Sequence, residues 1–307
     1  MLSSLGQQRS VRRVQVILRT VPNGEVGVRR WWRDNAAADA PFAASVLAEL
    51  LDDAYYLTRR PEALLVLALR SPRRSVRRIT PDGAARLEQD LLALVDALTG
   101  ADLAVEEWVS PAQVASVLRT SYDPASSPSP ADAGSESPPS MGVEEHWRYL
   151  RTDSAVHATY WISEWPRSDV NPAFLQPLVL SPGVFRSVTL VAEPLPIAAA
   201  LREIRRAKAE HTADAAQRSR IGQVEDEATR AEVEDLVRRE QELVAGHGDL
   251  RFSGLVTVTA PTLDELDAAC AATEAAAAQS LCEVRRLVGQ QGLAHLAGAV
   301  PLARGVL

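Results

Sequence analysis

The feature that most constrains the fold is a long polar segment with helical periodicity, Ile197 to Ala245, which lies between two alternating strands. The strand before it covers Phe185 to Ala192, and the strand after it covers Leu250 to Val258. If these strands are antiparallel neighbours, the two ends of the segment must lie close together. A single helix of this length would measure about 70 Å at 1.5 Å per residue, which would leave its far end stranded. We therefore expect a helical hairpin, 197–245, that turns near Arg220 to Gln223.

The two arms of this hairpin carry few apolar side chains. Leu201 and Ile204 lie on the first arm, and Leu236 and Leu243 lie on the second. A thin, charged hairpin either contacts a partner or serves as a solvated spacer, and the pattern leaves both alternatives open. These four residues are our candidates for partner binding.

Composition limits the class of protein. The chain has 307 residues, is 46% hydrophobic and has a net charge of -7, which suits two modest cores and does not suit a surface that grips nucleic acid. The two cysteines have no CxxC spacing, so we expect buried thiols in a reducing compartment. No apolar run approaches the roughly 20 residues that cross a bilayer, and no signal peptide opens the chain. We expect a cytoplasmic protein that reaches the inner face of the membrane only through partners.

A Pro/Ser-rich stretch divides the sequence into halves. Residues 123–145 contain no run of large apolar side chains that would offset their ordering entropy, which predicts a flexible linker. Each half follows an alternating β-α pattern, so we expect an α+β fold made of two ferredoxin-like (split βαβ) modules. The first module, 1–122, lacks its opening strand, and the second, 146–307, carries the helical hairpin.

Several individual elements are predicted on each side of this linker. Ser110-Pro111 and the capping box Thr262 to Glu265 mark helix starts. The predicted strands are Val14 to Leu18, Leu64 to Leu69, Leu103 to Trp108, Ala158 to Ile162, Phe185 to Ala192, Leu250 to Val258 and Cys282 to Leu287.

No strong catalytic motif occurs in the chain. A GxxxxGK[ST] phosphate loop, HExxH, GxSxG and CxxC are all missing, and no histidine stands at metal-ligand spacing from another His or Cys. We therefore expect a protein that is not an enzyme, with no catalytic, cofactor-binding or metal-binding residues and no cofactor.

Four weaker patterns have both a functional and a structural interpretation. The basic run Arg70 to Arg78 suits phosphates or anionic lipid, or is a solvated loop. The pair Trp31-Trp32 is a membrane-interface anchor or packs a helix onto a sheet. His157 with Glu164 suggests acid–base chemistry or a structural role. The aromatic rows of Tyr160 to Trp165 line a partner groove or pack in a core. In each case the structural interpretation is favoured.

Four motifs together resemble a known family. They are His157-x-x-Tyr160-Trp161-Ile162-x-Glu164-Trp165-Pro166, Val191-Ala192-Glu193-Pro194, Gln217-Arg218-x-Arg220-Ile221-Gly222 and Glu242-Leu243-Val244-Ala245-Gly246-His247. This combination resembles the actinobacterial conjugation-associated, PrgI-like membrane proteins linked to type IV secretion. The second half is also distantly similar to the N-terminal domain of TrbE/CagE-class secretion ATPases, including the closing segment Val300-Pro301-Leu302.

The resemblance implies a non-enzymatic docking component of a type IV-like secretion or conjugation apparatus. Its partners would be a secretion or conjugation ATPase or a membrane component, with a homo-oligomer as the alternative. The binding surfaces would be the hairpin and the sheet edge left by the missing first strand. The family supplies no catalytic residue to carry over, and its members carry membrane-spanning helices that this sequence lacks.

Two other classes remain as alternatives. A nucleic-acid-binding module would use exposed aromatic side chains on a ferredoxin-like sheet beside a basic patch. An enzyme of unrecognised chemistry would need a deep pocket with perturbed carboxylates.

Overall fold

The computed structural model describes most of the chain. It covers residues 11–22, 41–46, 49, 59–69, 81–100, 103, 105–124, 140–166, 170–180, 184–220 and 227–302. The longer strands are β1 (Val11–Pro22), β2 (Arg59–Leu69), β5 (Val156–Glu164), β6 (Phe185–Leu195) and β7 (Asp249–Ala260), and the short ones are β3 (Glu144–Glu145), β4 (Leu150–Arg151) and β8 (Glu283–Arg286). The helices are α4 (Pro81–Thr99), α5 (Pro111–Tyr122), α6 (Gln176–Val179), α7 (Ile197–Arg220), α8 (Glu227–Val244), α9 (Leu263–Gln279) and α10 (Gln291–Ala299).

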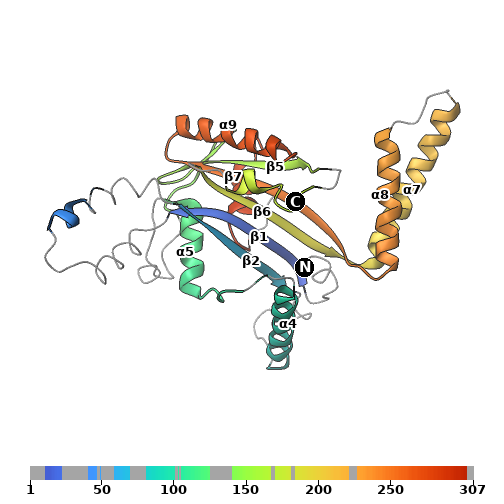
Figure 1. Ribbon diagram of the computed structural model, residues 1–307, viewed down its shortest axis with the longest axis horizontal. Helices are drawn as coiled ribbons and strands as arrows, with labels where there is room; N and C mark the ends of the chain where they lie inside the picture. The colour runs from blue at the N-terminus through green and yellow to red at the C-terminus, as the bar shows by residue number, and fades with distance from the viewer. Residues whose placement is uncertain are drawn as a thin grey trace. The chain divides into compact units, whose positions relative to one another are not determined.

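Strands from both halves of the sequence belong to one sheet (Figure 1). Its order is β2-β1-β6-β7-β5-β4-β3, and β8 pairs with β5 beside β4. β5 runs antiparallel to β4, β7 and β8, and Tyr160 lies opposite Val256 of β7 and opposite Arg286 of β8. The expectation of a separate sheet in each half was wrong, and the two ferredoxin-like modules are not confirmed.

The chain divides into two compact units that each combine segments from both halves. One unit draws on residues 1–14, 67–107 and 192–252, and the other on residues 15–66, 108–191 and 253–307. Neither unit coincides with the expected modules 1–122 and 146–307. The hairpin helices α7 and α8 belong to the first unit, and α9 and α10 belong to the second.

In the second unit, one face of the sheet is apolar and is covered by α9 and α6. Tyr160 and Ile162 of β5 and Val256 and Val258 of β7 form the apolar cluster with Leu266 of α9. The alternation of a strand places these side chains on the same face. The small residues Cys270, Ala276 and Ala277 of α9 belong to the same cluster, and they let this helix approach the strands closely.

The opposite face of the same strands is polar and buried, and α10 covers it. Gly298 of α10 lies so close to the sheet that an added Cβ would be 2.6 Å from Thr257 Oγ1. Gln291, at the first turn, accepts from the Thr159 backbone N–H at 2.9 Å and donates to Leu287 O at 2.7 Å. The Gln291 side chain thus takes the place of a strand residue beside β5.

Side chains from three other elements bond to the C-terminal carbonyls of α10. Gln15 Nε2 of β1 donates to Ala297 O at 3.3 Å and Val300 O at 3.2 Å. Ser187 and Thr189 of β6 each donate to Gly298 O at 2.6 Å. Ser121 of α5 donates to Ala299 O at 2.9 Å. The last carbonyls of a helix have no partner within the helix, so these donors satisfy them. We name these bonds the α10 clasp.

The α10 clasp connects β1, a strand of the first half, to the C-terminal end of α10 in the second half. Gln15 also accepts from the Leu302 N–H at 3.1 Å, so one side chain makes three bonds around the end of α10.

Both ends of the Pro/Ser-rich stretch attach to one turn, between β4 and β5. At the first end, Thr152 Oγ1 donates to Tyr122 O at 2.7 Å and Ser154 Oγ bonds to Asp123. At the second end, Asp153 accepts from the N–H groups of Met141 and Gly142 and from Ser140. The bond from Met141 is the main cause that lowers the pKa of Asp153.

The residues at both ends of the Pro/Ser-rich stretch are thus ordered. Residues 125–139 lie outside the described part, but its flanks are held together and Glu144–Glu145 pairs with β4 as a strand. The expected linker 123–145 therefore includes ordered residues, and its two flanks meet at the Thr152 to Ser154 turn.

Most locally coded elements are where the sequence predicts them. Ser110 caps α5 with a capping box to Gln113, and Thr262 caps α9 by accepting from Glu265 N–H. The expected strand Leu103 to Trp108 was wrong, because the described residues there form no strand. Leu103 N–H instead bonds back to Leu98 O behind α4, and Leu103 and Trp108 are exposed.

We predict that Gln15→Ala destabilises the protein because it leaves buried carbonyls of α10 without a donor. Loss of a buried partner costs roughly 1–3 kcal/mol. Urea unfolding measures this difference, and Gln217→Ala, at an exposed helical position, is the matched control and should stay within about 0.5 kcal/mol of wild type. Equal stability of the two variants would show that the α10 clasp is not stabilising.

Candidate protein-interaction site

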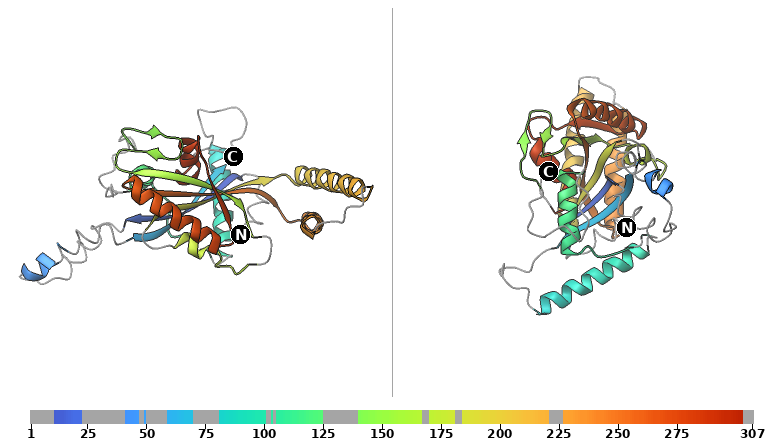
Figure 2. Two further views of the ribbon diagram at one scale, coloured as in Figure 1. Left: turned by 90° about the horizontal axis from the view of Figure 1, so that it is seen from above. Right: turned by 90° about the vertical axis from the view of Figure 1, so that its left-hand side faces the viewer.

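The region from Ile197 to Val244 forms two helices, α7 and α8, where the sequence predicts a helical hairpin. The helices lie side by side and run in opposite directions (Figures 1 and 2). The turn is expected at Arg220 to Gln223, and all of these residues but Arg220 lie outside the described part. α8 ends where predicted, because Gly246 adopts φ +94° and His247 N–H bonds to Glu242 O at 3.0 Å. This geometry is typical of a glycine-terminated helix.

The four candidate partner-binding residues pack inside the hairpin. Ile204 and Leu243 are buried with Ala200, and Leu201 and Leu236 pack against them as partly buried neighbours. These side chains thus hold the two helices together near their junction with the strands. Contact of any of the four with a partner stays a prediction.

Beyond this small cluster, polar pairs connect the arms. Lys208 of α7 bonds to Glu240 of α8, which lowers the pKa of that carboxyl group. His211 lies 3.9 Å from Glu232, and Arg218 Nη1 donates to Thr229 at 3.4 Å. These contacts follow one face of each helix, at spacings of three and seven residues on α7 and of three and eight residues on α8.

The two arms carry opposite net charges. α7 has six Lys or Arg against three Asp or Glu, a net charge of +3, and α8 has three Arg against six Asp or Glu, a net charge of -3. Because the net charges are opposite, they favour pairing of α7 with α8 over pairing of either helix with a copy of itself. Each exposed pair contributes little by itself, since water and salt screen it.

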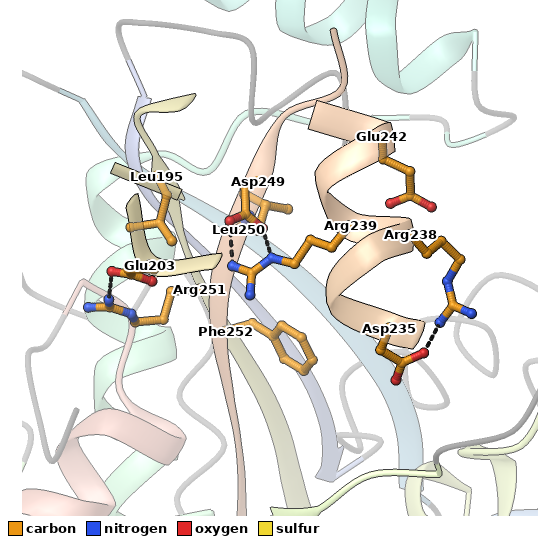
Figure 3. A pocket seen from close by; sticks show the side chains of 10 residues that line it. All are labelled: Leu195, Glu203, Asp235, Arg238, Arg239, Glu242, Asp249, Leu250, Arg251 and Phe252. Atoms are coloured by element: carbon orange, nitrogen blue, oxygen red, sulfur yellow. Dashed lines mark hydrogen bonds and ion pairs between the residues drawn. The ribbon is translucent and has the colours of Figure 1, made fainter. Parts of the chain in front are cut away.

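A groove lies beside the hairpin, at the junction of α8 with the start of β7 (Figure 3). Its volume is about 540 Å³, and Leu195, Leu250 and Phe252 supply its apolar lining. All of its lining residues belong to the first unit.

Three arginines border this groove, and each pairs with a carboxylate (Figure 3). Arg239 extends from α8 to Asp249 with two bonds, Arg251 pairs with Glu203 at 2.9 Å, and Arg238 pairs with Asp235 at 2.5 Å. The side chains of Arg238 and Arg251 are 67% and 65% exposed, so their pairs are readily exchanged. An aromatic side chain flanked by exposed arginines is a composition enriched at protein interfaces.

The chemical groups that line the groove are few in kind. Its charged groups are carboxylates and guanidinium groups, and its lining contains no Ser, Thr, Cys, Lys or His that would serve as a nucleophile or a near-neutral base. Within the described residues, no three His, Cys, Asp or Glu side chains are grouped closely enough to hold a metal ion.

The weaker sequence candidates are dispersed. Tyr160 lies in the apolar cluster and donates to Glu274 at 2.9 Å, and burial of its hydroxyl is the main cause that raises its pKa. Trp165 packs over Gly254 of β7, and Trp161 is 40% exposed. His157 is buried and bonds to Thr259 and Thr152, with no bond to Glu164. The basic run Arg70 to Arg78 and Trp31-Trp32 lie outside the described residues.

Sequence reasoning missed three buried polar residues. Gln15 and His295 are in the interior of the second unit, and Arg186 is buried with a bond only from Nη1 to Leu178 O among the described residues. Burial lowers the pKa of Arg186 to about 10. His295 lies in an apolar helical run, which would have marked it as buried, whereas Gln15 and Arg186 alternate with apolar residues and their burial has no local signal.

The comparisons with known proteins add no family. No family model matches the chain, and no curated protein matches it.

None of the helices in the described part of the chain combines the length and apolar character needed to cross a bilayer.

We predict that Ile204→Ala loosens the hairpin, because it opens a cavity between α7 and α8. Truncation of a buried isoleucine costs about 2–5 kcal/mol. Hydrogen exchange in peptides from α7 and α8 should rise accordingly. Val237→Ala is the control, since Val237 is 39% exposed and lies outside the apolar cluster. If both variants exchange like wild type, the cluster does not hold the arms together.

Proposed function

We propose that this chain is a non-enzymatic docking component of a type IV-like secretion or conjugation apparatus. Its partner is a secretion or conjugation ATPase or a membrane component, and any contact with the membrane is made through that partner. The observation that carries the proposal is the hairpin, which uses its apolar side chains internally and has a groove with exposed arginines beside it. The resemblance of the His157 to Pro166 and Glu242 to His247 motifs to the conjugation-associated family supports the same assignment.

The strand order also supports a split βαβ arrangement in the second half. β7 lies between β5 and β6, and β5 lies between β7 and β8. The two strands of each βαβ unit are thus separated by a strand of the other unit, as the name of the motif describes. We infer that β5 to β8 form a ferredoxin-like core to which β1 and β2 are added.

The nucleic-acid-binding alternative is less well supported. A ferredoxin-like sheet that binds RNA needs an open face with aromatic side chains. Within the second unit, α9 covers one face of β5 and β7 and α10 approaches the other. The net charge of -7 also opposes such binding.

The test is complex formation with the ATPase of the same conjugation system. The double variant Arg238→Glu with Arg251→Glu reverses the charge of two exposed groove arginines. We expect it to weaken the complex at least tenfold, as measured by light scattering after size-exclusion chromatography and by titration. We expect an effect of this size because arginine is among the residues that contribute most to binding at protein interfaces.

The matched control is Arg206→Glu with Arg285→Glu. These arginines are 83% and 63% exposed, each pairs with a carboxylate, and both lie outside the groove. The control should bind like wild type. A wild-type chain that binds neither the ATPase nor a membrane component contradicts the docking function. A complex that the groove variant retains at full strength contradicts only the role of the groove.

A further inference from the structure

Two histidine rings contact each other in a tilted arrangement in the interior of the second unit, where three elements meet. His157 of β5 and His295 of α10 are fully buried, and their ring centroids are 4.5 Å apart. Tyr122, the last residue of α5, places its ring 5.0 Å from that of His295. The rings therefore join α5, β5 and α10 at one point, independently of the hairpin.

The bonds of His157 determine which of its nitrogens carries the proton. Nε2 lies 3.2 Å from Tyr122 O, and a carbonyl oxygen only accepts, so Nε2 must donate. Burial favours the neutral ring, and in that form Nδ1, 2.9 Å from Thr259 Oγ1, accepts from that hydroxyl. Together with the contact of Nε2 with Thr152 Oγ1 at 3.1 Å, these bonds connect the end of α5 to β7 through β5.

His295 has no such partners. Among the described residues, neither of its ring nitrogens has a hydrogen-bond partner. The titratable groups that face it are Tyr122 from α5 and His157 from β5, and neither supplies a negative charge at neutral pH. A contact with the Ser121 backbone, outside hydrogen-bond geometry, acts to raise the pKa of His295, and no carboxylate contributes to the pKa of either ring. A proton on His295 would bring a buried charge against a second imidazole.

Burial lowers the pKa of both histidine rings, and the nearby His157 lowers that of His295 further. Burial lowers the pKa of His157 to about 4, and burial and then the charge of His157 lower the pKa of His295 well below its usual value. An unfolded or opened chain takes up these protons near pH 6.5. The folded form therefore loses stability as the pH falls below about 6.5, and for His157 the loss is complete near pH 4.

We propose that His157 and His295 form an acid-sensitive latch that releases α10 and the end of α5 from the sheet. α10 is the element that the latch controls because its C-terminal carbonyls hold Gln15 of β1 and Ser121 of α5. Protonation breaks no covalent bond. It places uncompensated charge between the helix and the strands, and water reaches that charge only when α10 moves away.

The test follows hydrogen exchange of the full chain between pH 7.5 and 4.5, with rates corrected for the intrinsic effect of pH. We expect the opening equilibrium of α10 and of the end of α5 to rise by up to about tenfold per pH unit for each histidine below pH 6.5. Peptides from α7 and α8 serve as an internal reference and should not follow this dependence.

The variant His295→Leu removes one of the two titrating rings and keeps an apolar side chain at the buried site. It should reduce the pH dependence of α10 opening by about half. The control His247→Gln, at an exposed position outside the latch, should behave like wild type. If His295→Leu does not fold, the dependence of the wild-type unfolding free energy on pH still tests the latch. A slope that corresponds to the uptake of about two protons on unfolding supports the latch. The latch is overturned if the hydrogen-exchange protection of α10 is unchanged from pH 7.5 to 5. It is also overturned if the pH dependence of α10 opening in His295→Leu is identical to that of wild type.

Discussion

The second unit depends on the way α10 lies against a polar sheet face. A helix of nine residues is too short to be stable by itself, so packing and capping must hold it in place. Gly298 and its alanine neighbours remove the side chains that would hold the helix off the strands, and Gln15, Ser121, Ser187 and Thr189 satisfy its last carbonyls. Each of these bonds pairs a group that burial would otherwise leave without a partner. Together they connect the first half of the sequence to the second.

The hairpin follows a different principle. Only its junction with the strands is apolar, and the arms farther out are joined by Lys208 to Glu240 and by weaker polar contacts. Helices that are polar on most sides gain little from each other, so such a structure is suited to a reversible contact with another surface. The groove beside α8 adds the aromatic and arginine side chains that an interface uses.

Local features were predictable, and long-range pairings were not. The caps at Ser110 and Thr262, the end of α8 at Gly246 and the two hairpin helices follow from short-range patterns. The single sheet depends on bonds such as that from Gln15 to Val300, which are 285 residues apart. A glutamine between two valines in a strand also fits a solvent-facing position, so its burial is not coded locally.

The candidate site shows the same limit. Periodicity identified Leu201, Ile204, Leu236 and Leu243 as apolar positions on the hairpin, but a stripe does not tell whether it faces the other arm or a partner. The groove combines residues from β6, α7, α8 and β7, and only the folded chain brings these together. The partner of His295 was equally hidden, because His157 lies far away in the sequence.

The most direct test of this account is to cut the chain inside the Pro/Ser-rich stretch. A protease site inserted between Pro130 and Ala131 would separate β1, β2 and α5 from the rest of the polypeptide after cleavage. Because the α10 clasp and the Thr152 to Ser154 turn join the pieces, we predict that they remain together in native size-exclusion chromatography and separate in urea. Two pieces that separate without denaturant, each folded, would instead support two independent modules and contradict the single sheet.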